Sequence, residues 1–155
     1  MHLEANLTRH VDVAASPDAV LSVLSEVPDS SAHFPTLLSL VAERGGYTWT
    51  LEPVGVKGVS VQLTYGCRYT TAGHTVSWVP IDGVGNCSVS GKWTVTPSGS
   101  GSRMELESNV IVELKLPRML RPLAQPTLEK HNARLIEEYL ANLATTFNGG
   151  DGRLR

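Results

Sequence analysis

Residues 103–147 read RMELESNVIVELKLPRMLRPLAQPTLEKHNARLIEEYLANLATTF, and the change of period inside this stretch decides the fold. In its first third, apolar side chains and Ser108 occupy every second position, which is typical of a strand with one buried face. After Pro117 the apolar residues recur at helical spacing to the end of the stretch. Pro122 and Pro126 interrupt the start of this helix, so we expect a short turn or a kinked entry there.

The chain upstream of this stretch reads as a succession of strands. Glycine-rich or polar sequences separate them, including Gly45-Gly46, Ala72-Gly73 and Asp82-Gly83. Short and regular connections of this kind favour antiparallel hairpins over βαβ units. The predicted strands cover residues 37–44, 47–54, 58–71, 75–81, 86–96 and 103–116.

The N-terminal part of the chain predicts a strand followed by two short helices. Residues 3–13 alternate between apolar and polar side chains, with Arg9 as the one charge on the apolar face. Ser16 is a good N-cap for a helix that begins at Pro17 and ends by Val27. Residues 29–34 predict a second short helix.

This order of elements predicts an α+β fold in which a curved antiparallel sheet of about seven strands wraps around one long C-terminal helix. A sheet with one apolar face needs a second layer, and the last helix has the length to supply it. The chain resembles the START-like, or SRPBCC, superfamily of helix-grip proteins, in its polyketide cyclase-like or coenzyme Q-binding-like branch. The resemblance lies in residues 10–20 (HVDVAASPDAV), in Phe34-Pro35, and in the ending from 116–118 (LPR) to 140–143 (LANL).

The resemblance implies a cavity between sheet and helix that holds a hydrophobic small molecule or a lipid. It covers residues 1–148 as one START-like domain, and residues 149–155 are expected to form a flexible tail. Relatives include simple binders, lipid carriers and cyclases, so the fold leaves the chemistry open.

Composition excludes several other classes. The 155 residues carry a net charge of −2 and a pI near 6.2, which argues against nucleic-acid binding. We expect no membrane-spanning segment and no signal peptide, and hence a cytoplasmic location. With turns at residues 72–73 and 82–83, Cys67 lies near Trp78 and Trp78 near Val89. This places Cys67 and Cys87 two strands apart, roughly 10 Å, too far for a disulfide.

The candidate ligand-binding residues share the apolar face of their strands or lie beside the helical stripe. Each aromatic residue among them is either ordinary core or part of a cavity wall. Arg9 is either a pocket residue or a surface residue paired with an acidic neighbour. The candidates are Arg9, Trp49, Tyr65, Cys67, Tyr69, Trp78, Trp93, Ser108, Val110, Val112, His131, Leu135 and Tyr139.

The sequence contains no recognisable catalytic motif, nucleotide-binding loop or metal-ligand spacing, so we expect no metal and no cofactor. Our first hypothesis is a binding or transport protein for a hydrophobic ligand, whose identity and protein partners stay open. The second is a polyketide cyclase or aromatase-like enzyme that uses the same cavity. The third is an interaction module whose cavity has collapsed, and a lipocalin-like barrel is a weaker alternative for the fold.

Overall fold

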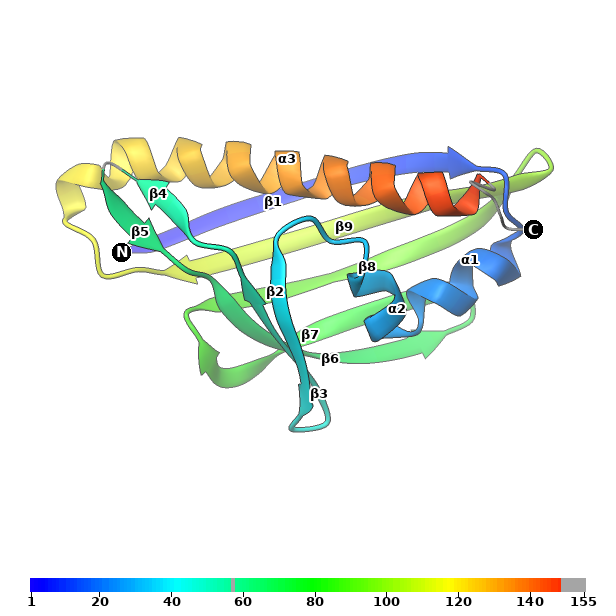
Figure 1. The fold of residues 1–155 in the computed structure, drawn as a ribbon, viewed down its shortest axis with the longest axis horizontal. Coiled ribbons are helices and arrows are strands. Elements are labelled where there is room, and N and C mark those ends of the chain that lie inside the picture. The colour runs from blue at the N-terminus through cyan, green and yellow to red at the C-terminus, as the bar shows by residue number, and fades with distance from the viewer. Residues whose placement is uncertain (57, 149–155) are drawn as a thin grey trace.

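The computed structural model describes residues 1–56 and 58–148. Its main sheet has seven antiparallel strands in the order β1-β9-β8-β7-β6-β3-β2. The sheet curves, and the long helix α3 (Arg121–Phe147) runs across it (Figure 1). This arrangement confirms the predicted curved sheet and C-terminal helix. The seven strands are β1 (His2–Val13), β2 (Leu37–Glu43), β3 (Gly46–Leu51), β6 (Thr64–Ala72), β7 (Thr75–Gly85), β8 (Cys87–Ser98) and β9 (Gly101–Glu113).

The two short helices follow β1 as predicted, with shifted boundaries. Helix α1 (Pro17–Leu24) begins at the predicted cap, where Ser16 Oγ accepts a hydrogen bond from the amide of Ala19 at 3.2 Å. It ends three residues before Val27, and α2 (Val27–Ser31) starts at Val27 itself. Pro28 lies in the first turn of α2 and does not end α1. Proline is tolerated there because the amide groups of the first helical turn have no partner within the helix.

The entry to α3 is the predicted short turn. A 3₁₀ turn, η1 (Arg118–Leu120), leads into α3, and Pro122 lies in the first helical turn. Pro126 lies inside the helix, and α3 continues through it to Phe147. The predicted flexible tail, residues 149–155, lies outside the described residues.

The predicted strands 47–54 and 58–71 are wrong in extent. The first ends at Leu51, and the second is divided into β5 (Val59–Val61) and β6. Strand β5 pairs with β4 (Val54–Val56) in a separate two-stranded sheet, which lies beside the first turns of α3 (Figure 1). Pro53 interrupts the first strand because it has no amide to donate to a neighbouring strand.

The register of the central hairpins also differs from the prediction. Strand β7 continues past the expected turn at Asp82-Gly83 and reaches Gly85, and Tyr69 pairs with Trp78. Trp78 in turn pairs with Gly91, not Val89. Each shift is two residues, so every side chain keeps its predicted face. Cys67 and Cys87 lie on β6 and β8, and both are free thiols, as predicted.

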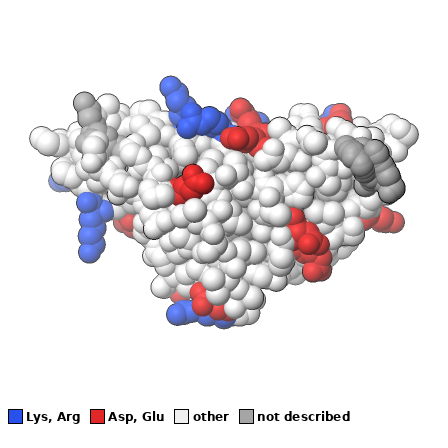
Figure 2. Space-filling view, viewed as in Figure 1, with Lys and Arg blue, Asp and Glu red and all other residues white. Residues whose placement is uncertain are grey.

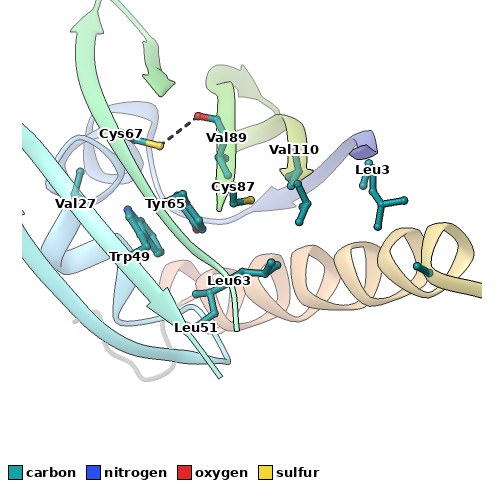
Figure 3. Close-up of a cluster of buried hydrophobic side chains, with 13 residues drawn as sticks. Leu3, Val27, Trp49, Leu51, Leu63, Tyr65, Cys67, Cys87, Val89 and Val110 are labelled. Atoms are coloured by element: carbon teal, nitrogen blue, oxygen red, sulfur yellow. Dashed lines mark hydrogen bonds between the residues drawn. The ribbon is translucent and has the colours of Figure 1, made fainter. Parts of the chain in front are cut away.

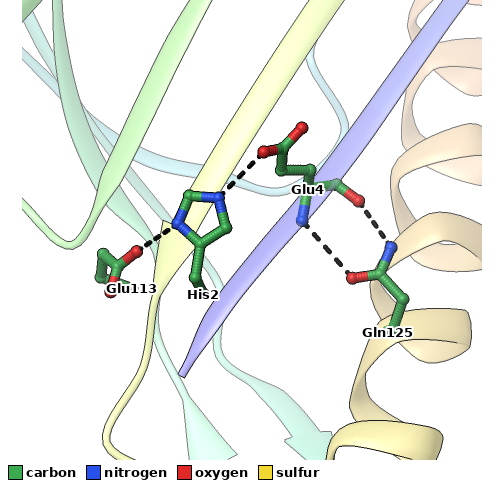
Figure 4. A network of polar contacts seen from close by, with 4 residues as sticks. All are labelled: His2, Glu4, Glu113 and Gln125. Carbon is green, nitrogen blue, oxygen red and sulfur yellow. Dashed lines mark hydrogen bonds and ion pairs between the residues drawn. The ribbon is translucent and has the colours of Figure 1, made fainter.

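Helix α3 is attached to the edge strand β1 at both of its ends. The amide group of Gln125 donates to the carbonyl of Glu4 at 2.7 Å and accepts from its backbone amide at 3.4 Å (Figure 4). At the other end, Asn148 Oδ1 accepts from the amide of Ala14 at 2.8 Å. These side chains form hydrogen bonds with backbone groups along the sheet edge that would otherwise have no partner in the sheet.

The core consists of two clusters of buried side chains between the sheet and the helices. The first includes Leu3, Trp49, Tyr65 and Val112, several of which Figure 3 shows beside α3. The second lies toward α1 and the C-terminal end of α3. Phe34, Tyr69 and Trp78 pack against both clusters. A cavity lies where the two clusters meet, lined by residues from both.

Candidate functional site

A cavity of about 90 Å³ lies between the concave face of the sheet and α3. Strands β3, β6, β7, β8 and β9 form one wall, and residues 128–139 of α3 form the opposite wall. Leu24, Ser30 and Phe34, from α1, α2 and the segment after α2, complete the enclosure. None of the described lining residues is Asp, Glu, Lys or Arg, so the wall carries no permanent charge.

Most of the residues that the sequence singles out meet at this cavity. They converge because each lies on the inward face of its strand or on the buried side of α3, and these faces enclose one space. Eleven of the candidates line it, namely Trp49, Tyr65, Cys67, Tyr69, Trp78, Trp93, Ser108, Val110, His131, Leu135 and Tyr139.

Two candidates lie elsewhere. Arg9 is exposed on β1, with its Nε 3.5 Å from Glu137 Oε2 and its Nη1 donating to the carbonyl of Thr8. Arg9 lies on the apolar face of β1, but at this edge of the sheet its side chain reaches Glu137 on the exposed side of α3. Of the two alternatives for Arg9, the structure therefore shows a surface residue paired with an acidic neighbour. Val112 is fully buried and lines a second, smaller cavity.

Twelve further lining residues are absent from the sequence-based set. Those on strands lie on the same inward face as the predicted candidates, so the alternation of apolar and polar side chains could have identified them. Ser30 and Phe34 carry no such signal, because their place depends on how α2 packs against α3. The twelve are Leu24, Ser30, Phe34, Leu51, Leu63, Val76, Cys87, Val89, Leu106, Leu128, Asn132 and Ile136.

Gly91, on β8, adds no free space to the cavity, because the ring of Trp78 lies against it. A Cβ atom at this position would lie 3.0 Å from Trp78 Cζ2 and 2.1 Å from the carbonyl oxygen of Glu107. The glycine therefore permits Trp78 to lie flat over β8 and does not enlarge the cavity.

Aromatic side chains form a continuous group around the cavity. Trp49 stacks on Tyr65 with ring centroids 5.7 Å apart, and its indole Nε1 donates to the Tyr69 hydroxyl at 2.9 Å. Phe34 meets Trp49 and Tyr139 edge-on, at 5.6 and 5.1 Å. These contacts link the sheet, the segment after α2 and α3 around one space, and such edge and stacked pairs add to the stability of the walls.

Two hydrogen bonds hold the segment after α2 to α3. His33 Nε2 lies 2.9 Å from Thr146 Oγ1, and Asn142 Nδ2 donates to the carbonyl of His33 at 2.8 Å. Phe34 is the next residue, so these two bonds fix its position over the cavity. We call His33, Asn142 and Thr146 the α2–α3 clasp.

Burial keeps most polar groups of the cavity in their neutral forms. It raises the pKa of the Cys67 and Cys87 thiols to about 12, and the pKa of the Tyr139 hydroxyl to about 12, with a hydrogen bond from Ser30 opposing the last shift. Desolvation, and secondarily the positive charge of Arg134, lowers the pKa of His131. At neutral pH the imidazole of His131 is therefore uncharged and has one nitrogen free to accept a proton.

Asn132 contributes a buried donor that lacks a partner among the described residues. Its Nδ2 is shielded from solvent, and the side chain lies on the α3 wall of the cavity. A buried amide without a hydrogen bond costs free energy, so native proteins satisfy nearly all such groups. An unsatisfied donor on a cavity wall marks a place where a ligand acceptor gains a hydrogen bond.

Two further observations concern metal binding and membrane-spanning helices. Among residues 1–56 and 58–148, no group of three His, Cys, Asp or Glu side chains is arranged to hold a metal ion. No helix of these residues has the length and apolar character needed to cross a membrane.

The fold and the enclosed apolar cavity are those of a helix-grip protein. The model of the family "Polyketide cyclase / dehydrase and lipid transport" matches residues 4–148, and the chain belongs to this family. No curated protein matches the chain.

Solved structures show the same fold at low sequence identity. A START superfamily protein from Mycobacterium smegmatis is 16% identical, with a TM-score of 0.64 over 90% of this chain and 94% of its own. The Zhui aromatase/cyclase from Streptomyces sp. R1128 is 17% identical, with a TM-score of 0.61 over 97% and 99%. The di-domain aromatase/cyclase StfQ of the steffimycin biosynthetic pathway is 13% identical, with a TM-score of 0.63 over 94% of this chain and 51% of its own.

Proposed function

We propose that the cavity binds a hydrophobic small molecule or a lipid, for storage or transport, and that residues 1–148 act as one ligand-binding domain. The observation that carries the proposal is an uncharged, aromatic-lined cavity whose wall includes Asn132, a residue with an unpartnered donor among the described residues. A concave apolar site with few polar groups is the usual form of a small-molecule site.

The ligand must enlarge the cavity. Ligand sites commonly measure roughly 300–1,000 Å³, and an apolar cavity of about 150 Å³ takes a benzene-sized molecule, whereas this one measures about 90 Å³. The walls formed by the sheet are fixed by backbone hydrogen bonds. Rotation of the side chains of Phe34, Leu63 and Leu128 should cost less free energy than movement of the paired strands.

Native mass spectrometry of the purified protein, followed by solvent extraction, tests this proposal. We expect an apolar molecule to remain bound under gentle ionisation and to be released by unfolding. A matched sample of the Val110→Trp variant, whose added ring fills the cavity, serves as a control and should bind less. Equal recovery from both proteins, or no bound molecule together with no binding of added apolar compounds, contradicts the proposal.

A second candidate function is a polyketide cyclase or aromatase reaction in the same cavity. The observation that favours it is His131, a neutral imidazole on the wall that suits a general base. Two of the structurally similar proteins are aromatase/cyclases. Incubation with a linear poly-β-ketone substrate tests it, and His131→Gln should lower the turnover roughly 100-fold or more. Absence of turnover in the unaltered protein contradicts this candidate without affecting ligand binding.

The cytoplasmic location expected from the sequence stays a prediction.

A further inference from the structure

A second, almost wholly apolar cavity of about 30 Å³ lies beside the first, toward the N-terminal end of α3. Its walls come from β1, β9, the β4–β5 hairpin and the first turns of α3, and they include Leu3, Val54, Leu114 and Ala124. The hairpin that interrupts the predicted strand 58–71 thus closes this cavity on one side.

Three side chains line both cavities, namely Leu63, Leu128 and His131, and they therefore form the partition between them. Figure 3 shows Leu63 directed toward α3, with Leu3 farther along toward the N-terminal end of the helix. Leu63 precedes β6 in the short connection from β5, and Leu128 and His131 are only partly buried on one face of α3. Rotation of leucine side chains opens such a partition without breaking backbone hydrogen bonds.

We propose that the two cavities join into one elongated site, and that the ligand is a neutral, linear molecule with an apolar chain and a hydrogen-bond acceptor. This inference rests on the proposed function and specifies the ligand class. The joined site extends along α3 from Tyr139 to Ala124, about 22 Å at 1.5 Å per residue. That shape fits an extended chain.

The distribution of polar groups fixes the orientation of the ligand. The second cavity offers Thr127 as its one hydroxyl, and that hydroxyl already donates to the carbonyl of Leu123 at 2.7 Å. Asn132, whose Nδ2 has no partner among the described residues, lines the main cavity. The apolar chain therefore occupies the second cavity, and a carbonyl or hydroxyl oxygen of the ligand accepts from Asn132. A carboxylate is disfavoured because no Lys or Arg lines either described cavity.

A chain-length series tests the inference. Straight-chain methyl ketones of increasing length are titrated against the protein, and binding is followed by tryptophan fluorescence, since all three tryptophans line the main cavity. We expect affinity to rise about fourfold per added methylene until the chain fills the second cavity.

The variant Thr127→Phe fills the second cavity and leaves the main one intact. It should weaken binding of long ketones at least about tenfold while changing the affinity for short ones less than about twofold. Thr145→Phe is the matched control: its hydroxyl makes the same bond to the residue four positions earlier, Ala141, and it lines neither cavity. Leu128→Ala, which opens the partition, should favour long ketones.

The outcomes separate the two proposals. If ketones of every length fail to bind, the proposed function itself is wrong. If short ketones bind but longer chains gain nothing, or if Thr127→Phe weakens short and long ketones equally, the cavity binds ligands and the elongated site is wrong. A long-chain preference that Thr127→Phe removes and Thr145→Phe retains supports the inference.

Discussion

Asn132 illustrates how one residue on the cavity wall trades stability for binding. Its Nδ2 is buried without a partner among the described residues, and the folded protein bears the cost of desolvating it. Its sequence neighbour His131 avoids a similar cost by remaining uncharged, because burial lowers the pKa of the imidazole. Both residues lie on the α3 wall of the cavity.

Replacement of Asn132 by leucine should therefore raise stability and lower affinity. We expect the Asn132→Leu variant to gain about 1–3 kcal/mol in the free energy of unfolding, measured by urea denaturation, because the unsatisfied donor is gone. Binding of methyl ketones should weaken, since the ligand oxygen loses its donor. Asn142→Leu is the control: its amide has a partner, the carbonyl of His33 at 2.8 Å, so this variant should lose about 1 kcal/mol. Destabilisation by both variants would contradict the assigned role of Asn132.

At the scale of elements, the site depends on how α2 and β1 are attached to α3. The α2–α3 clasp fixes Phe34 over the cavity, and Gln125 and Asn148 hold α3 to the edge strand β1. The strands of the sheet walls are paired with one another by backbone hydrogen bonds, although β7 and β8 pair only from Thr75 to Trp78. The segment after α2 is therefore the element through which a ligand passes most easily.

Loosening the clasp should accelerate ligand exchange. In Thr146→Val, His33 Nε2 loses its partner on α3, and we expect faster hydrogen exchange of the backbone amides in residues 30–34 and a higher dissociation rate for bound ketone. Thr145→Val is the matched control, because that hydroxyl bonds only within α3. Identical exchange in the two variants would show that ligands enter by another route.

The β1–β9 edge carries a pH-dependent contribution to stability. His2 lies between two carboxylates, Glu4 at 2.9 Å and Glu113 at 2.6 Å, and hydrogen bonds to Glu4 and then Glu113 raise the pKa of the imidazole (Figure 4). A pKa that is higher in the folded than in the unfolded state stabilises the protein below the unfolded value and loses this effect as pH rises through the folded value.

The variant His2→Gln tests this contribution. The difference in Tm between the unaltered protein and His2→Gln should be largest below the ordinary pKa of histidine, about 6.5, and should shrink as pH rises through the raised pKa of the folded protein. Because all three side chains are about half-exposed, added salt should reduce the difference. A Tm difference that grows toward alkaline pH would have the wrong sign and would contradict the assignment.

The elements differ in how well the sequence predicts them. Alternation on β9 and its neighbours identified the inward residues, and a two-residue error in register left their faces unchanged. Parity does not say how far a residue lies from the sheet edge, so Arg9 was placed with the pocket candidates although it pairs with Glu137 outside. The place of Phe34 at the cavity and the β4–β5 hairpin were not predicted, because both depend on contacts between segments distant in sequence.

At the scale of the whole molecule, the charges lie outside and the centre is neutral. Charged side chains are scattered over the face shown in Figure 2, with broad uncharged areas between them. The cavity has no charged residue among its described walls. Because no Asp, Glu, Lys or Arg lines the cavity among the described residues, we expect it to select neutral apolar ligands by shape and by one or two hydrogen bonds.

Methyl NMR with a straight-chain methyl ketone tests whether the ligand occupies the cavity between the sheet and α3. We expect the largest shifts at methyl groups on the cavity walls, such as those of Val89, Val110 and Leu135, and unchanged signals from the exposed Leu38, Val41 and Val79. Shifts confined to the exposed methyl groups, with the cavity methyls unmoved at saturation, would contradict the account.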